Sequence, residues 1–231
     1  MMDCISVENM RLSDAQTIAN WVPSLELMGR AAMGVYRAAE WKGRVAIVAG
    51  SGNNGGDGYA LACILAKAGV YCEIFTVSPR LSADSAHYAA LAEARGVTAR
   101  PYTPGCLRGF DMVVDCLLGT GFSGGVRENY RAAIEGINES GAYVLSVDIN
   151  SGMNGDTGEG ESVVRSHLTV TIGFVKNGLV TESAGQHMDR LVCVDIGIRL
   201  AREENRIGGP GGIPCPPWLD MEVICVEEGT V

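Results

Sequence analysis

The stretch RVAIVAGSGNNGGDGYALACILAKAG, Arg44 to Gly69, decides the fold class. It opens with a continuous apolar run, passes through a glycine-rich turn, and continues as a helix-forming segment that stops at Gly69. A strand that is covered on both faces reads as such an apolar run, and a glycine commonly follows the last turn of a helix. The stretch therefore predicts a strand, a glycine-rich turn and a helix, which is the opening unit of a doubly wound α/β fold.

The same alternation continues along the chain and predicts the architecture. Strands are predicted at 44–49, 71–77, 97–102, 111–118, 143–149, 168–172 and 191–196, and helices at 57–68, 83–95 and 128–140. This order predicts a three-layer α/β/α sandwich around a Rossmann-like, doubly wound, mostly parallel sheet.

An amphipathic helical segment is predicted ahead of the first strand, at 13–42. Its second part begins near Pro23 and Ser24, with Ser24 as the expected N-cap. The apolar stripe of this segment is expected to pack on the sheet or on a partner subunit.

The length and composition predict one domain. The chain has 231 residues, 47% of them hydrophobic, which is enough for one well-buried core. We expect that domain at 1–202 and a Gly/Pro-rich tail or linker at 203–231. Within the tail, the stretch RIGGPGGIPCPPWLD, 206–220, is rich in Gly and Pro and is not expected to form regular structure.

Charge, cysteine usage and hydropathy disfavour several classes of partner. The net charge of −9 disfavours nucleic acid, and no apolar run is long enough to span a bilayer. The eight cysteines form no C-x-x-C motif and predict buried free thiols in a cytoplasmic protein. His87, His167 and His187 lie far apart, without partners at metal-ligand spacing.

Polar, glycine-rich turns follow several of the predicted strands. They are Gly50–Gly58, Gly119–Gly125 with Asp115 ahead of it, and Asp148–Gly152, while Lys176 follows the sixth strand. Ligands of open α/β sheets bind beyond the carboxyl ends of the strands. The turns are therefore expected to converge on one ligand site, although each taken alone is equally compatible with a purely structural turn.

An NADP-dependent oxidoreductase is one alternative. The second strand, 71–77, is followed by Arg80, which suits a 2′-phosphate, and its end lacks the acid that an NAD site places there. That function gives no reason for Asn53, Asn54 and Asp57 in the first turn.

Oxygen-bearing side chains in these turns favour a hard cation. Asn54 offers an amide oxygen, Asp115 a carboxylate and Ser151 a hydroxyl, and backbone carbonyls of the second turn complete an oxygen cage. A single strong carboxylate favours a monovalent ion.

Three motifs in order resemble the NAD(P)H-hydrate epimerase family, also described as the YjeF N-terminal-domain family. They are GNNGGDG after a strand, D-x-x-x-G-T-G-x-x-G at Asp115–Gly124, and V-D-I-x-S-G at Val147–Gly152. The segments SLELMGRA and TVTIGFVKNGL resemble further family patterns, and the likeness covers roughly 10–200. Two departures are Asn150, where the family usually has proline, and Gly29, where it favours glutamate; the first is expected to loosen the turn.

The resemblance implies epimerisation of hydrated NADH and NADPH, with potassium as cofactor, a homodimer that uses the apolar stripe, and a separate or fused dehydratase as functional partner. A catalytically inactive scaffold module of the same fold is the other alternative. The implied metal ligands are Asn54, Asp115 and Ser151, and the implied catalytic groups are Asp148 and, secondarily, Lys176. The implied substrate-binding residues are Asn53, Asn54, Gly55, Gly56, Asp57, Gly119, Thr120, Gly121, Phe122, Ser123, Gly124, Gly125 and Asp148.

The implied reaction needs an acid and a base. The hydrated nicotinamide carries a hydroxyl on C6, beside the ring nitrogen, which expels it as water and leaves a flat iminium. Water then adds to the opposite face. We expect one carboxylate, Asp148, to serve both steps by changing its protonation state.

Overall fold

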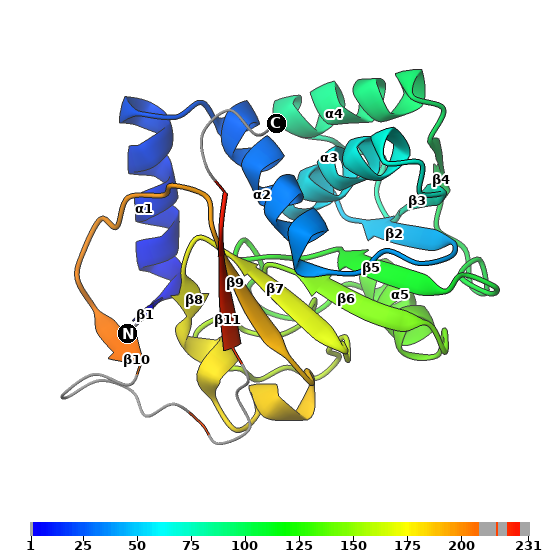
Figure 1. Ribbon diagram of the computed structural model, residues 1–231. Coiled ribbons are helices and arrows are strands. Elements are labelled where there is room, and N and C mark those ends of the chain that lie inside the picture. The colour runs from blue at the N-terminus through cyan, green and yellow to red at the C-terminus, as the bar shows by residue number, and fades with distance from the viewer. Residues whose placement is uncertain (1, 208–215, 217–220, 227–231) are drawn as a thin grey trace.

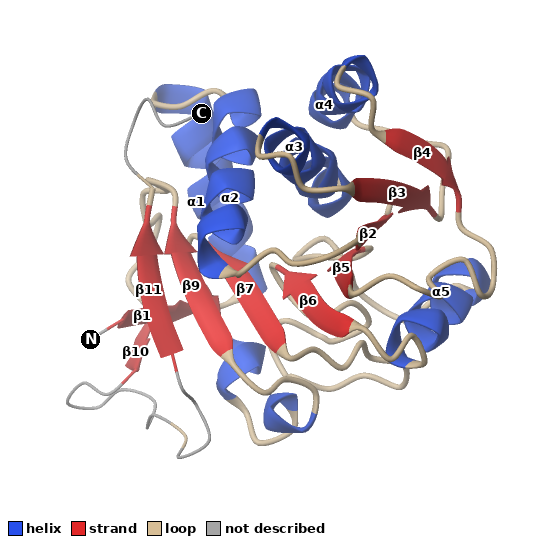
Figure 2. Ribbon diagram, turned by 45° about the vertical axis from the view of Figure 1, so that its right-hand side comes forward, coloured by secondary structure: helices blue, strands red, loops and turns tan. Residues whose placement is uncertain are grey.

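An eight-stranded parallel sheet forms the centre of the computed structural model (Figures 1 and 2). The structure describes residues 2–207, 216 and 221–226. The strand order is β11-β9-β7-β6-β5-β2-β3-β4, and every neighbouring pair is parallel. The strands are β2 (Val45–Ala49), β3 (Cys72–Thr76), β4 (Thr98–Pro101), β5 (Met112–Cys116), β6 (Tyr143–Val147), β7 (Leu168–Ile172), β9 (Leu191–Asp195) and β11 (Met221–Cys225).

Helices cover both faces of this sheet and complete the three-layer sandwich predicted from the sequence. Figure 2 shows α2, α3 and α4 above the sheet and α5 below it. The helices are α1 (Val7–Asn20), α2 (Ser24–Ala38), α3 (Asn53–Lys67), α4 (Ala83–Ala94) and α5 (Glu128–Asn138), with the short 3-10 helices η1 (Asn177–Val180) and η2 (Ala184–Gln186).

The central strand β2 shows why its sequence is apolar throughout. All five of its residues are buried. Val45 and Ile47 pack into the core with α2, α3 and α4, whereas Ala46 and Val48 pack into the core with α5. Alternate side chains of a strand point to opposite faces, so a strand between two helical layers needs apolar residues at both registers.

A second, three-stranded sheet lies beside the main one. It has the order β10-β1-β8, from β10 (Asn205–Ile207), β1 (Met2–Ile5) and β8 (Val175–Lys176). The sequence did not predict β1. In the segment after Arg202, two strands that the sequence did not predict lie at the ends of the stretch RIGGPGGIPCPPWLD: β10, which includes Arg206 and Ile207, pairs with β1, and β11 extends the main sheet beside β9. The rest of that segment, 208–215, 217–220 and 227–231, lies outside the described residues.

The N-terminal helical segment differs from its prediction in bounds and in packing. It consists of two helices, and α1 begins at Val7, where Ser6 Oγ accepts a hydrogen bond from the backbone N–H of Asn9. Pro23 rather than Ser24 occupies the N-cap position of α2. The apolar stripe of α2, including Leu27 and Val35, is buried in the chain's own core. That stripe is therefore not a free surface for a homodimer, contrary to the expectation from the sequence.

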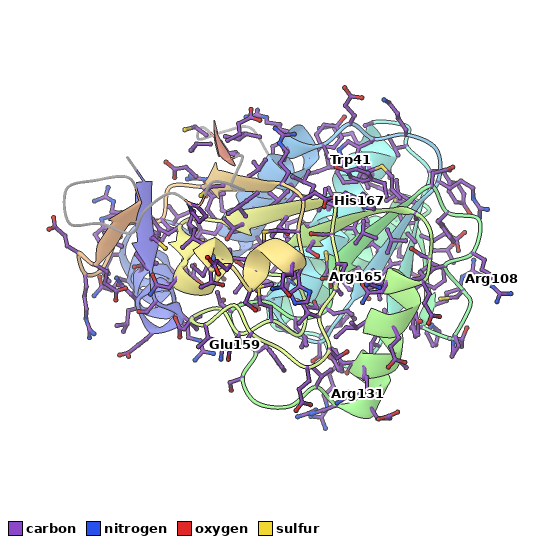
Figure 3. The ribbon with its side chains drawn as sticks, turned by 90° about the horizontal axis from the view of Figure 1, so that it is seen from below. Trp41, Arg108, Arg131, Glu159, Arg165 and His167 are labelled. Atoms are coloured by element: carbon purple, nitrogen blue, oxygen red, sulfur yellow. The ribbon has the colours of Figure 1, made fainter. Side chains whose placement is uncertain are left out.

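The cysteines and histidines have structural surroundings. Of the seven cysteines in the described residues, five are buried, Cys106 is half-buried and Cys225 is exposed; all seven are free thiols. His167 directly precedes β7 (Figure 3). Its ring stacks on Tyr143, and its Nδ1 accepts a hydrogen bond from the backbone N–H of Val144. Among the described residues, no helix has the length and apolar character needed to cross a membrane.

Candidate functional site

A cavity of about 590 Å³ lies at the carboxyl edge of the main sheet. Its walls come from α1, α2, the start of α3 and the turn 117–125, and Asp148 lies at the end of β6. The predicted convergence of the glycine-rich turns therefore holds for the described structure. This size is in the usual range of small-molecule sites.

The first glycine-rich motif is the beginning of α3 rather than a loop. Asn53–Gly56 form the first turn of the helix, after Gly52 as N-cap. A side chain at Gly55 is excluded, because its Cβ would lie 2.1 Å from the carbonyl oxygen of Gly50. Asn53 and Asn54 of this first turn line the cavity, and the first backbone N–H groups of a helix commonly bind anions such as phosphate.

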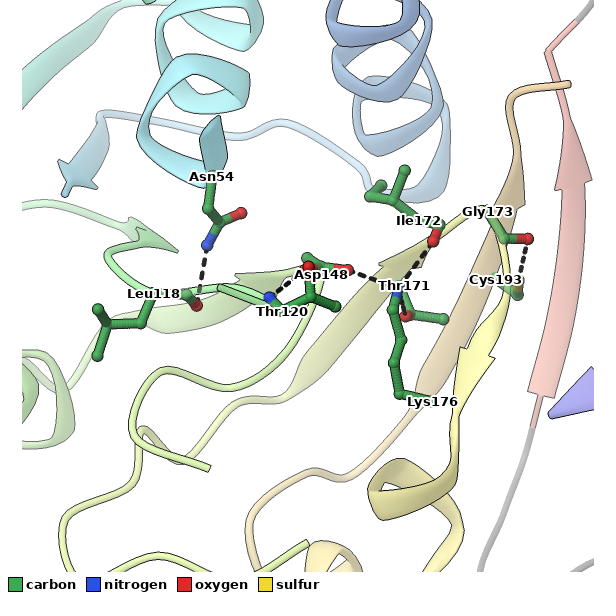
Figure 4. A network of polar contacts seen from close by, with 9 residues as sticks. All are labelled: Asn54, Leu118, Thr120, Asp148, Thr171, Ile172, Gly173, Lys176 and Cys193. Carbon is green, nitrogen blue, oxygen red and sulfur yellow. Dashed lines mark hydrogen bonds and ion pairs between the residues drawn. The ribbon is translucent and has the colours of Figure 1, made fainter. Parts of the chain in front are cut away.

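The second turn is fastened to Asp148. The Asp148 Oδ2 atom accepts a hydrogen bond from the backbone N–H of Thr120 at 2.9 Å (Figure 4). A Cβ at Gly119 would lie 2.7 Å from the same oxygen and 3.3 Å from the Cβ of Asn54. Glycine at 119 thus lets the turn lie between Asp148 and the start of α3.

Asp148 is also half of a buried ion pair. Its Oδ1 lies 2.6 Å from Lys176 Nζ, which additionally donates to Thr171 Oγ1 at 3.0 Å and to the carbonyl of Ile172 at 2.7 Å (Figure 4). The Lys176 side chain is fully buried, whereas Asp148 keeps 12% of its side chain exposed towards the cavity.

Asp148 has a φ of +70° and is the one non-glycine residue with positive φ among the described residues. A strained conformation of this kind at the mouth of a site often positions a functional group.

Asn54, Asp115 and Ser151 meet around the carbonyl of Leu118. Asn54 Nδ2 donates to that carbonyl at 3.1 Å, and Ser151 Oγ lies 3.2 Å from it and 2.5 Å from Asp115 Oδ1. Asn54 Oδ1 is buried without any hydrogen-bond partner among the described residues. A buried unpaired acceptor of this kind fits a cation ligand.

Asp115 fits the proposed cage less directly. It is fully buried, and its two oxygens accept four hydrogen bonds, from Leu117 N, Ser151 N, Ser151 Oγ and Ser146 Oγ. Those bonds use the lone-pair directions of the carboxylate, so Asp115 contributes its charge from beneath the site. Burial raises the pKa of Asp115, and the bonds from Ser151, Leu117 and Ser146 oppose that shift.

Three further carboxylates, those of Asp14, Asp57 and Asp84, line the cavity with Asp148, and two of them have raised pKa values. Burial raises the pKa of Asp57 well above its ordinary value, and the neighbouring charges of Asp148 and Asp14 raise it further. Burial also raises the pKa of Asp14, again with a contribution from Asp148. No group of three or more His, Cys, Asp or Glu side chains in the described part of the chain is close enough to hold a metal ion. The charges of Asp14, Asp57 and Asp148 therefore influence one another, although these side chains do not form a metal-binding cluster in the described structure.

The structure brings most of the predicted substrate-binding residues to the cavity. All of them line it except Gly55, Gly56 and Gly124. Lys176 does not line it, and acts behind Asp148. Asp115 and Ser151 lie beneath Asn54, outside the lining.

Sequence reasoning missed the wall formed by α1. Met10, Arg11, Asp14 and Ile18 line the cavity from this helix, and Arg11 Nη2 donates to the carbonyl of Thr120 at 2.9 Å. The available signal was the helical spacing of Arg11 and Asp14 between the apolar Met10 and Ile18.

Asn150 also differs from its expected effect. Its fully buried side chain donates to Val164 O, Ser166 Oγ and His187 O and accepts from Thr169 Oγ1. The expectation of a looser turn is therefore wrong, because hydrogen bonds fix the position that a proline ring was expected to fix.

Comparison with known proteins places these features in a family. The family model described as YjeF-related protein N-terminus matches residues 24–178. An NAD(P)H-hydrate epimerase of Limosilactobacillus fermentum is 35% identical over 202 residues, covering 83% of this chain and 95% of that protein. A protein of the same description from Rhodopirellula baltica is 37% identical, covering 76% of this chain and 75% of its own.

Two other relatives add context. The bifunctional NAD(P)H-hydrate repair enzyme Nnr of Coxiella burnetii is 32% identical over 83% of this chain, which spans 41% of that protein. The crystal structure of yeast ynu0 superposes with a TM-score of 0.68 at 21% identity, covering 77% of this chain and 83% of that one, and so supports the fold. Because the family model spans well over half of the chain and the epimerases match along most of their length, the chain belongs to the YjeF-related protein N-terminus family.

Proposed function

We propose that this chain is an NAD(P)H-hydrate epimerase, an isomerase that interconverts the two C6 epimers of hydrated NADH and NADPH. The observation that carries the proposal is the likeness to the Limosilactobacillus fermentum epimerase, which the chain matches over 95% of that protein's length. The cavity agrees with this proposal, because its lining combines a helix N-terminus suited to phosphates with the carboxylate of Asp148.

Asp148 is the group that we place at the reacting carbon. Its carboxylate faces the cavity and is held at both oxygens, by Lys176 and by the backbone N–H of Thr120. A general acid or base has to lie within hydrogen-bond reach of the proton that it moves. Lys176 is a positioning residue in this proposal, since its ammonium is fully buried and already donates three hydrogen bonds.

Potassium is the cofactor that we propose for the oxygen cluster around Leu118. Asn54 Oδ1 and Ser151 Oγ would hold it, with the Asp115 carboxylate supplying the negative charge beneath. A hard monovalent cation there would balance the buried charge and draw substrate phosphates towards the start of α3. The unpaired Asn54 Oδ1 atom supports this assignment.

The functional partner that we propose is an NAD(P)H-hydrate dehydratase. The support is that relatives described as bifunctional repair enzymes contain a region like this chain within a longer protein. A homodimer and a cytoplasmic location remain proposals, and the dimer surface has to be one other than the buried stripe of α2.

The direct test is interconversion of purified epimers. Each single epimer of hydrated NADH is incubated with the protein in potassium chloride, and the two epimers are separated chromatographically over time. We expect both starting epimers to reach the same mixture faster than in buffer alone. A catalytically inactive scaffold would bind the nucleotide without changing either rate, and that result would overturn the proposal.

A further inference from the structure

The proposed reaction acts on both faces of a ring, yet Asp148 is fixed. Its two oxygens are held by Lys176 Nζ at 2.6 Å and by Thr120 N at 2.9 Å (Figure 4). The leaving hydroxyl and the returning water lie on opposite faces of the flat iminium. A carboxylate that is tied at both oxygens reaches one of these faces, so a second group is needed at the other.

Asp14 is available on a different wall of the same cavity. Its side chain is half-buried, lines the cavity, and has no hydrogen bond or ion pair with any residue that the structure describes. Arg11, one turn earlier on α1, donates to the carbonyl of Thr120, whereas Asp148 accepts from the N–H of the same residue. Residues of α1 and of the sheet edge thus both bond this turn, and Asp14 and Asp148 line the same cavity.

The apolar side chains around Asp14 suit the ring rather than the phosphates. Met10 and Ile18 lie one turn before and one turn after Asp14 on α1, and both line the cavity together with Leu27, Ile172 and Ile198. Flat organic rings bind in such apolar sections, with a few placed polar groups. Asp57, in contrast, lies on α3 one turn after Asn54, at the glycine-rich end where phosphates are expected.

We propose that Asp14 is a second catalytic acid and base, which acts on the ring face opposite to Asp148. The inference rests on the proposed epimerase function. When the hydroxyl faces Asp14, the carboxylic acid gives it a proton, the C6–O bond breaks, and the nitrogen lone pair forms the C6=N1 bond as water leaves. Water on the other face forms the new C6–O bond, the π electrons return to nitrogen, and the Asp148 carboxylate takes the proton.

One proton moves from Asp14 to Asp148 in that direction, and exchange with solvent restores the starting state. The opposite epimer uses the two residues in exchanged roles. The surroundings of Asp14 favour its protonated form, because burial and the charge of Asp148 raise its pKa, although Lys176 opposes the shift. The other charged residues that line the cavity are Arg11, Asp57, Asp84 and Arg127.

Oxygen exchange from labelled water tests the assignment. The parent protein incorporates ¹⁸O into both epimers as they interconvert. In Asp14→Asn, a hydroxyl on the Asp148 face still leaves and returns on that face. We expect epimerisation to fall by about 10²–10⁴ while one epimer continues to exchange with retention. Asp148→Asn is expected to show the converse pattern, with exchange in the other epimer.

Control variants make a failure interpretable. Glu8→Gln removes an exposed acid from the same helix and is expected to leave both rates unchanged, and Asp14→Glu is expected to restore exchange in both epimers. Equal loss of exchange in both epimers of Asp14→Asn, or one-sided exchange in Asp57→Asn instead, would overturn the assignment. If the parent protein fails to interconvert the epimers, the proposed function fails; if only the one-sided pattern is missing, this inference alone fails.

Discussion

Replacing Asp148 by asparagine separates the catalytic role of the carboxylate from its structural role. Asparagine is nearly isosteric and tolerates the left-handed region, so the φ of +70° adds no new backbone strain. The substitution removes the counter-charge of Lys176, whose side chain is fully buried. The substitution is therefore expected to lower stability as well as turnover.

The expected loss of stability follows from the ion pair. Breaking a buried pair by removing one partner costs about 3–5 kcal/mol. The lower end applies here, because Asp148 is partly exposed to the cavity and Lys176 keeps its bonds to Thr171 Oγ1 and Ile172 O. A loss of about 3 kcal/mol corresponds to a melting temperature lower by roughly 6–12 °C in a chain of this size.

Turnover is expected to fall further than the stability. Asparagine neither donates a proton to the hydroxyl nor accepts one from water, and loss of a positioned acid or base costs about 10²–10⁴ in rate. The assay measures epimerisation at saturating hydrated NADH, well below the melting temperature, beside a thermal melt of the same sample.

The double variant Asp148→Asn/Lys176→Met is the matched control. It removes both charges, so its loss of stability is expected to be smaller than the sum of the two single losses by about 1–3 kcal/mol. Its turnover is expected to stay as low as that of Asp148→Asn. If Asp148→Asn melts early yet turns over each bound molecule at the parent rate, Asp148 is structural and the mechanism is wrong.

Three further outcomes are expected. Potassium chloride should raise the melting temperature above that in tetramethylammonium chloride at equal ionic strength, and Asn54→Ala should abolish the difference while Asn53→Ala keeps it; equal responses of both variants would refute the cation site. Asn150→Ala should lower the free energy of unfolding by about 2–4 kcal/mol, because it leaves buried hydrogen-bonding groups unpaired, and a denaturant melt measures this. Asp14→Asn should be more stable than the parent near neutral pH, but not below about pH 4. The raised pKa of Asp14 stabilises the parent while the carboxyl is protonated, and this contribution is lost as the pH rises through that pKa. Melting temperatures of the two proteins should therefore converge at acid pH, and a difference that stays constant with pH would contradict the reasoning.

The main sheet was predictable because its strands carry the signal on both faces. The runs at Val45–Ala49, Met112–Cys116 and Tyr143–Val147 are almost wholly apolar, and glycines mark the ends of the intervening helices. The strands at the edges carry a weaker apolar signal in the sequence. β1 has four residues and gains its partners from β8 and β10, far along the chain, and β11 follows a proline-rich segment whose breakers outweigh the short apolar run.

The three glycine-rich turns were predictable as one site for a topological reason. Parallel strands place their carboxyl ends at the same edge, so the residues after β2, β5 and β6 meet whatever the details of their side chains. The identity of the hydrogen-bond partners was not available in that way. Asp148 bonds both Thr120 and Lys176, and both oxygens of Asp115 accept bonds from protein donors. These partners depend on distances in the folded chain, which the spacing of residues in the sequence does not determine.

The sequence did not predict that α1 lines the cavity, because the face that this helix buries is polar. Asn9, Ser13 and Thr17 recur at intervals of four and are all buried. Their side chains bond the backbone of the segment 199–202, through Arg202 O, Ala201 N and Arg199 N. A search for apolar periodicity overlooks such a stripe, since its partner is the polar backbone of an irregular segment rather than an apolar core. The bonds turn the adjacent face of the helix, with Asp14, towards the cavity. Both α1 and the segment 199–202 lie outside residues 24–178, so the two ends of the chain jointly build the wall on which the second catalytic carboxylate is proposed.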